Sequence, residues 1–193
     1  MKTNRLLLIL MLLTLPVTMF AQSKHLTFKG IPIDGTLKEF SKKLVQNGFI
    51  EVETTTAFAE FEGTFAGHSN CTVVAYSSPD GQLVHSVAVI FPQLDSWSLL
   101  EGQYRNIKES LIKKYGAPVL ETESFQTDYE PKDDFSKLHE LKMDRCNYQT
   151  SFTTEEGVIM LQISHQSYYC YVLLGYADNI NMTITQNAAD DDF

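Results

Sequence analysis

The feature that most constrains the fold is a change of hydrophobic periodicity that occurs twice along the chain. Residues 36–47 and 96–115 place apolar side chains at helical spacing, and a run with the two-residue period of β-strands follows each of them. Strands of this kind bury one face, which amphipathic helices can cover. The order therefore predicts an α+β protein, an antiparallel sheet with two helices packed on one face.

Both predicted helices carry terminal signals. Thr36 and Glu39 form a capping box, in which the threonine hydroxyl accepts a hydrogen bond from an early backbone N–H and the glutamate reaches back to the cap. Gly48 and Gly116 follow the last helical residues and suit the positive φ that ends many helices. The apolar stripes consist of Leu37, Phe40, Leu44 and Val45, and of Leu100, Tyr104, Ile107 and Leu111. The two helices are expected to share one sheet face through Leu37, Phe40, Leu44, Leu100, Ile107 and Leu111.

The strand segments are joined by recognisable turns. In Ser78-Pro79-Asp80-Gly81 the proline fixes φ at the second turn position and the glycine accepts the left-handed conformation, and Thr154-Glu155-Glu156-Gly157 is a similar signal. Residues 82–91 are apolar on both faces, with Val87 on one and Val84 on the other, which predicts a central strand. The predicted extended segments are residues 26–33, 50–52, 58–65, 71–77, 82–91, 119–125, 145–152, 157–165 and 168–177.

A weak internal repeat divides the chain into two α-β-β-β-β-type halves. Cys71 and Cys146 begin comparable strands, and the acidic segment 126–136, predicted to be a loop, is the natural place for the insertion that the repeat requires. The predicted organisation is a signal peptide over residues 1–22, a first half over 23–95, a second half over 96–185 and a flexible acidic tail over 186–193.

The first 22 residues have the pattern of an export signal. Lys2 and Arg5 precede an apolar core, residues 6–15, which is shorter than the roughly 20 residues that a membrane-spanning helix needs. Ala21 is the expected cleavage point. The pattern predicts a periplasmic or secreted protein, and the alternative is a retained N-terminal anchor.

Charge limits the class of partner. The chain has a formal net charge of −9; without Lys2 and Arg5 it carries 13 basic against 24 acidic residues, a net charge of −11. A net-acidic chain without a basic patch is a poor ligand for a phosphate backbone, so we expect no nucleic-acid partner. No later apolar run reaches spanning length, so we expect no transmembrane segment. The expected partner is another exported protein or a small ligand.

Three cysteines, Cys71, Cys146 and Cys170, remain after export. An oxidising compartment allows one disulfide and one leftover thiol, whereas the β character around each favours three small buried side chains. If strands 145–152, 157–165 and 168–177 are consecutive neighbours, two strand spacings separate Cys146 from Cys170, and a disulfide between them is excluded.

The stretch His25-Leu26-Thr27-Phe28-Lys29-Gly30-Ile31-Pro32-Ile33-Asp34-Gly35-Thr36-Leu37 resembles the opening of a group of uncharacterised exported proteins of Gram-negative bacteria. Lys114-Tyr115-Gly116-Ala117-Pro118 is similar in kind, and the group brings no activity to carry over. The element order resembles the tandem-repeat fold of beta-lactamase inhibitory protein. Residues 26–53 also resemble the small β-α-β signalling domain of secretins and TonB-dependent receptors. None of these likenesses assigns a function.

No catalytic motif with specific spacing is present, and we expect no metal site and no cofactor. Cys71 with His68 and Cys170 with His165 are the nearest pairs of a nucleophile and a base. Offsets of three and five along an unbroken strand place the two side chains of each pair on opposite faces, which disfavours both. A hydrolase acting on glycan or peptide through an unrecognised site remains the alternative function.

Tyrosines concentrate on the segment 168–177, which is apolar on both sides, so one set of its side chains faces away from the helices. We expect the outward set to join Met160 and Gln162 in a concave binding face, and the protein to be a non-enzymatic binding module. The alternatives are tyrosines that fill the core, or strands that curl and bury both faces. The predicted contact residues are Met160, Gln162, Tyr168, Tyr169, Tyr171 and Tyr176.

Overall fold

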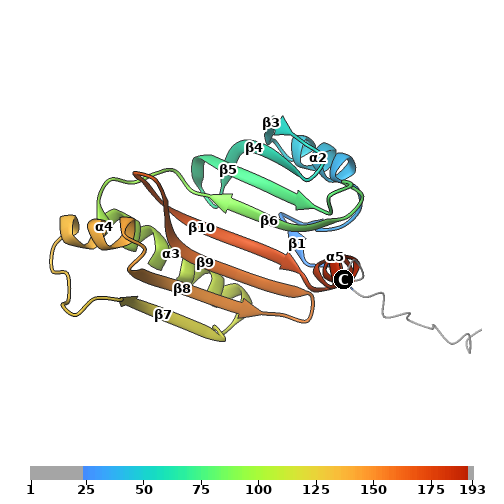
Figure 1. The fold of residues 1–193 in the computed structure, drawn as a ribbon. Helices are drawn as coiled ribbons and strands as arrows, with labels where there is room; N and C mark the ends of the chain where they lie inside the picture. The colour runs from blue at the N-terminus through green and yellow to red at the C-terminus, as the bar shows by residue number, and fades with distance from the viewer. Residues whose placement is uncertain (1–23, 191–193) are drawn as a thin grey trace, which may run out of the picture.

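The computed structural model describes residues 24–190 of the chain, which form one eight-stranded antiparallel sheet, a small two-stranded sheet and four helices (Figure 1). The predicted signal peptide lies outside the described residues. The strands of the large sheet are, in spatial order, β3 (Ile50–Thr54), β4 (Phe58–Phe65), β5 (His68–Ser77), β6 (Val84–Ile90), β10 (Tyr169–Asp178), β9 (Gly157–Gln166), β8 (Cys146–Thr153) and β7 (Leu120–Phe125). The small sheet pairs β1 (Thr27–Phe28) with β2 (Ile31–Pro32).

The strand order joins two meanders at their last strands. Helix α2 (Leu37–Gln46) precedes β3 to β6, and helix α3 (Trp97–Tyr115) precedes β7 to β10. β6 and β10 pair antiparallel at the centre, with Leu174 opposite Val89. The predicted α+β class is therefore present. Each half supplies one leading helix and four strands, with a further helix, α4 (Asp134–Lys142), between β7 and β8, and the predicted boundary at residues 95 and 96 falls between β6 and α3.

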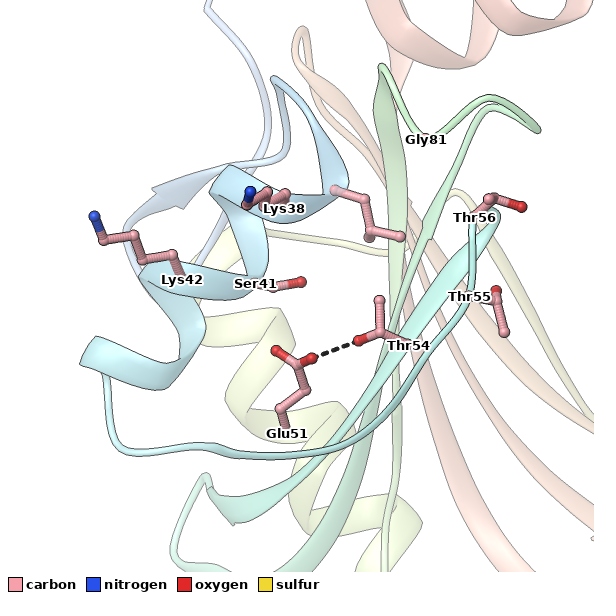
Figure 2. Close-up of a pocket in the computed structure, with 9 residues that line it drawn as sticks. Lys38, Ser41, Lys42, Glu51, Thr54, Thr55, Thr56 and Gly81 are labelled. Carbon is pink, nitrogen blue, oxygen red and sulfur yellow. Dashed lines mark hydrogen bonds between the residues drawn. The ribbon is translucent and has the colours of Figure 1, made fainter.

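The helix α2 forms as its sequence signals predict. Thr36 accepts the N–H of Glu39, the glutamate carboxylate accepts the N–H of Thr36, and Gly48 follows the helix with φ +89°. The buried stripe packs over the first half of the sheet. At the edge strand β3 the cover ends: a cavity of about 480 Å³ separates Ser41 of α2 from Glu51 (Figure 2). All five residues of this edge strand are exposed, and Glu51 and Thr54 line the pocket.

The helix α3 matches its predicted span but is capped from outside itself. Ser96 is the N-cap residue and makes no side-chain cap hydrogen bond. Instead, the carboxylate of Asp134, on helix α4 (Asp134–Lys142), accepts the N–H of Ser98 at 3.3 Å and its hydroxyl at 2.7 Å. An anionic group at a helix N-terminus is stabilising because it satisfies free N–H donors and faces the positive end of the dipole.

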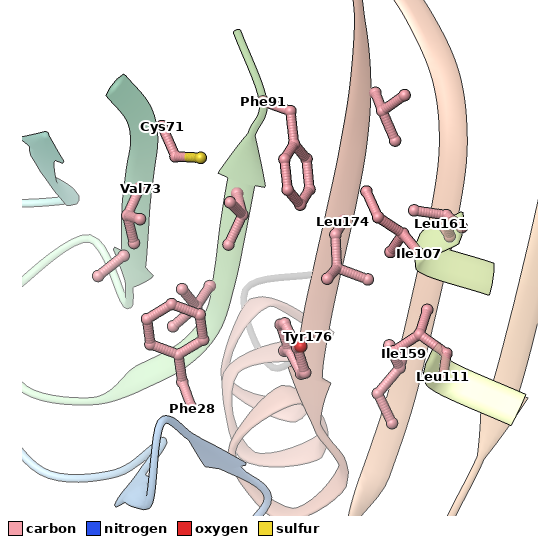
Figure 3. Close-up of a cluster of buried hydrophobic side chains, with 14 of the residues drawn as sticks. Phe28, Cys71, Val73, Phe91, Ile107, Leu111, Ile159, Leu161, Leu174 and Tyr176 are labelled. Atoms are coloured by element: carbon pink, nitrogen blue, oxygen red, sulfur yellow. The ribbon is translucent and has the colours of Figure 1, made fainter. Parts of the chain in front are cut away.

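One hydrophobic core runs under both halves (Figure 3). The helix stripes meet the inward side chains of the sheet there, so α2 and α3 share one sheet face as expected. Phe28 of β1 packs edge-on against Tyr176 with ring centroids 5.6 Å apart, which ties the small sheet to the centre of the large one. The fully buried large side chains are Trp97, Tyr104, Phe28, Phe40, Phe61, Phe91, Phe152, Ile33, Leu44, Leu100, Ile159 and Leu161.

Two helices were not expected. Segment 126–136 was predicted to be a loop, but α4 begins at Asp134; Asp133 caps it by accepting the N–H of Ser136. The second unexpected helix, α5 (Asn179–Asp190), lies where β10 ends (Figure 1), so the boundary of the predicted tail at residue 186 falls inside a helix. Residues 191–193 lie outside the described residues.

The described helices include none that is both long and apolar enough to cross a membrane.

Candidate functional site

The two sides of the large sheet differ in their cover. On one side, the inward residues of β9 and β10 are buried against the helices. Figure 1 shows the sheet from the opposite side, with α3 behind these strands. We call this other side the open face. Its residues on the central strands are Tyr76 and Val74 of β5, Ser86, Ala88 and Ile90 of β6, Tyr169, Tyr171, Leu173, Gly175 and Ala177 of β10, and Val158, Met160, Gln162 and Ser164 of β9.

The structure brings four of the six predicted contact residues onto the open face. Tyr169 and Tyr171 point outward from β10, and Gln162 and Met160 point outward from β9. Register places Gln162 opposite Leu173 and Met160 opposite Gly175. Tyr169 is 60% exposed, and the other three side chains are partly exposed.

The other two predicted contact residues lie elsewhere. Tyr176 is on the helix side, only 6% exposed, and burial raises the pKa of its phenol well above the ordinary value. Tyr168 is 84% exposed in the turn between β9 and β10, next to the open face rather than on it. The outward set of β10 is therefore Tyr169, Tyr171 and Leu173.

Sequence reasoning missed the part of the open face that β4 to β6 contribute. Val74 lies between Glu60 and Ala88 in the register and is only 7% exposed, although it points away from the helices. Tyr76, 41% exposed, lies opposite Phe58. The sequence did contain a signal for this part of the face, because the outward positions of β5 and β6 are apolar or aromatic apart from Thr72 and Ser86.

Charge on the open face has one sign. None of the eight strands contains a lysine or an arginine. The outward carboxylates are Glu60 and Glu62 of β4 and Glu53 of β3, because Ala59 and Phe61 of β4 are buried on the helix side. None of these three carboxylates makes an ion pair or a side-chain hydrogen bond with any residue in 24–190.

One cluster of ionisable groups lies where α3 meets β7, away from the open face. Lys108 donates to Glu121 at 3.2 Å and to Glu123, and Arg105 contacts Glu123 at 3.1 Å. Burial alone would lower the pKa of Lys108, but the hydrogen bonds that it donates to the two glutamates outweigh this effect and raise the pKa above the ordinary value. These groups pair with one another and fix the edge strand to the helix.

Both pairs of cysteine and histidine lie on the same sheet face, contrary to the expectation from their offsets. Asn70, with φ +56°, breaks the alternation of β5, so the His68 ring contacts core Phe91 on the side where Cys71 is buried. Cys170 is the direct cross-strand partner of His165, because a turn separates them.

Neither pair has the geometry of an activated nucleophile. Cys71 donates its thiol hydrogen to the carbonyl of His68 at 3.4 Å, and His165 hydrogen-bonds to Asp144 at 3.0 Å rather than to Cys170. Burial raises the pKa of both thiols, and thiol nucleophiles need the opposite shift. All three cysteines are free. The hydrolase alternative gains no support from these residues.

Within residues 24–190, no group of three or more histidine, cysteine, aspartate or glutamate side chains is placed to hold a metal ion. Comparisons of the chain with protein-family models, with curated proteins and with solved structures find no match, so the open face is interpreted from its own geometry.

Proposed function

We propose that the protein is a non-enzymatic binding protein of the periplasm or the cell exterior, and that it contacts an exported protein or a small ligand through the open face. The observation that carries the proposal is the outward set of β10 beside Met160 and Gln162 of β9. A sheet with helices on one side commonly presents polar residues on the other. Here β10 presents Tyr169, Tyr171 and Leu173, and β9 adds Met160 beside Gln162.

Tyrosine suits a contact surface because it offers a large apolar ring, a polar hydroxyl and few rotatable bonds. Tyr169 and Tyr171 lie on the same side of one strand, two residues apart, and Gln162 supplies an amide beside Leu173 on the next. An apolar patch with polar groups at its border is the usual composition of a protein contact site. The residues of β10 and β9 therefore support binding better than they support a purely structural role.

The test compares capture by matched variants. Tyr169→Ser with Tyr171→Ser removes both rings from the open face, and Phe135→Ser removes an aromatic ring that is 83% exposed on α4. Each purified protein is immobilised, exposed to a periplasmic extract of the source cells, and its bound species are identified by mass spectrometry. Thermal melts and circular dichroism establish that all three proteins are folded.

We expect a species that the wild-type protein and Phe135→Ser both retain and that the double tyrosine variant loses. Equal capture by all three proteins contradicts a role for the open face. Loss of the species from Phe135→Ser as well contradicts the assignment of the contact to β10.

A further inference from the structure

The open face is not uniform across the sheet. Its outward carboxylates, Glu53 of β3 and Glu60 and Glu62 of β4, form an acidic zone that also contains the apolar Ile50 and Phe58. The outward residues of β5, β6 and β10 are mostly aromatic, aliphatic or small, and those of β8 are asparagine, glutamine, serine and threonine. The acidic and apolar zones adjoin directly, since Glu60 is the register partner of Val74 and Glu62 is that of Thr72. The two zones therefore form one continuous surface.

The carboxylates of the acidic zone are available to a ligand. Glu60 and Glu62 make no ion pair or side-chain hydrogen bond within the described residues, and no strand supplies a cation to neutralise them. Val74, beside Glu60, is almost fully buried. Water is therefore partly excluded from the side of Glu60 that faces Val74, and an ion pair formed there is screened less than one in open solvent.

The size of the surface selects a polypeptide over a small cation. β4 and β10 are three strand spacings apart, about 14 Å at about 4.8 Å per spacing. A metal ion or an amine metabolite that meets Glu60 cannot also reach Leu173, whereas an extended peptide or a protein surface can. Nucleic acid and anionic lipid carry the same sign of charge as the glutamates and are repelled.

These observations deepen the proposed function, on which the following inference rests. We propose that the open face from β3 to β10 binds a cationic polypeptide segment, one in which lysine or arginine side chains lie beside apolar ones. The cations pair with Glu53, Glu60 and Glu62, and the apolar side chains cover Val74, Tyr76 and the outward set of β10. Charge complementarity fixes the position of the partner, and burial of the apolar zone supplies most of the affinity.

The test uses three synthetic peptides with a fluorescent label, in which pairs of valines alternate with pairs of lysines, serines or glutamates, so that each side of the extended peptide carries both residue types. Fluorescence anisotropy measures their binding to the full processed chain. We expect the lysine peptide to bind most tightly, the serine peptide less tightly and the glutamate peptide least. Raising the salt concentration from about 0.05 to about 0.5 M should weaken the binding of the lysine peptide alone, because the Debye length falls to about 4 Å and exposed charges further apart than this are largely screened.

A pair of variants with the same change in net charge localises the effect. Glu60→Gln with Glu62→Gln neutralises the acidic zone, and Glu109→Gln with Glu130→Gln neutralises two exposed carboxylates on α3 and in the loop before α4. The first pair should weaken the lysine peptide about fivefold and leave the serine peptide unchanged, since each exposed ion pair contributes about 0.2–1 kcal/mol. The second pair should change neither by more than about twofold.

Equal weakening by both pairs of variants overturns the inference, because the peptide then responds only to overall charge. Equal binding of the lysine and glutamate peptides also overturns it. So does a wild-type dimer in sedimentation experiments that Glu60→Gln with Glu62→Gln dissociates, because the occupant of the face is then a second copy of the chain. The proposed function fails separately: it is contradicted if Tyr169→Ser with Tyr171→Ser leaves the binding of the serine peptide unchanged.

Discussion

The carboxylate of Asp178 accepts the backbone N–H of Leu26 at 2.8 Å, across 152 residues of sequence. Its other oxygen accepts the N–H of Asn181 at 2.9 Å, as an N-cap residue does for a helix, and lies 3.2 Å from a ring nitrogen of His25. Asn181 in turn donates to the carbonyls of Ile33 and Val84. The end of β10, the start of α5 and the start of the described chain are thus held by one fully buried carboxylate.

Asp178→Asn should therefore lower the free energy of unfolding by about 1–3 kcal/mol, because one amide cannot accept from both backbone N–H groups and leaves one buried donor unsatisfied. Urea denaturation measures the change. Glu155→Gln, at an exposed position in the nearby turn, is the control and should stay within about 0.5 kcal/mol of the wild type. Equal stability of the two variants would show that the second acceptor oxygen of Asp178 contributes nothing to the stability of the fold.

The shared core under α2 and α3 gives a second prediction. Phe40→Ala and Leu111→Ala should each lower the free energy of unfolding by about 2–5 kcal/mol, since both side chains are buried and their loss leaves a cavity. Val45→Ala and Ile112→Ala, at exposed positions of the same helices, should cost less than about 0.5 kcal/mol. A loss below about 1 kcal/mol for either buried position contradicts the packing of that helix on the sheet.

Local signals were sufficient where an element specifies its own ends. The capping box of Thr36 and Glu39, the positive φ at Gly48 and Gly116, and the turn at Gly81 are all present in the structure. These features depend only on residues a few positions apart, so the sequence contains all of their physical causes. The same holds for the hairpins that join β8, β9 and β10, whose expected order is confirmed.

The missed helices depend on weaker or more distant causes. α4 has a capping box in Asp133 and Ser136, but its acidic approach resembles a loop. α5 is rich in asparagine and threonine, which are poor helix formers, and it is held by Asp178 and Asn181 through contacts to segments more than 90 residues away. Tertiary contact supplies what local propensity lacks.

The site was predictable in kind but not in extent. Alternation on residues 168–177 requires one set to face outward, but it does not say which, because both sets are apolar. Packing decides: Tyr176 meets Phe28 on the helix side, which leaves Tyr169 and Tyr171 outside. The pairing of β6 with β10 joins the two halves of the open face, and no local pattern encodes a contact between strands about 85 residues apart.

The cysteines give a third prediction. Burial raises the pKa of Cys146 to about 12. At a pH of about 8, the fraction of this thiol that is ionised should therefore be more than about a hundredfold below that of a free cysteine. Iodoacetamide should label it far more slowly in the native protein than in urea, as peptide mass spectrometry can measure. The same map without reductant should contain no bridge between Cys146 and Cys170, which β9 separates. Finding that bridge would contradict the strand order.

The last prediction concerns acid. Arg145 donates to Glu140 at 2.6 Å and Tyr129 donates to it at 2.5 Å, and these hydrogen bonds lower the pKa of this glutamate, whose side chain has no exposed surface. In the unfolded chain the same group titrates near its ordinary pKa of about 4.3. Because the folded pKa is the lower one, the pair stabilises the fold fully above about pH 4.3 and loses that contribution as the pH falls through the folded pKa.

Glu140→Gln removes the titrating group and keeps a side chain of the same shape. Urea midpoints measured from neutral pH to about pH 3 should therefore fall less steeply for this variant than for the wild type, while Glu109→Gln, at an exposed position, should follow the wild-type slope. The variant should also be the less stable protein at neutral pH, where the wild-type glutamate is ionised and paired with Arg145. A wild-type slope in Glu140→Gln would show that this carboxylate has the same pKa in the folded and unfolded chain.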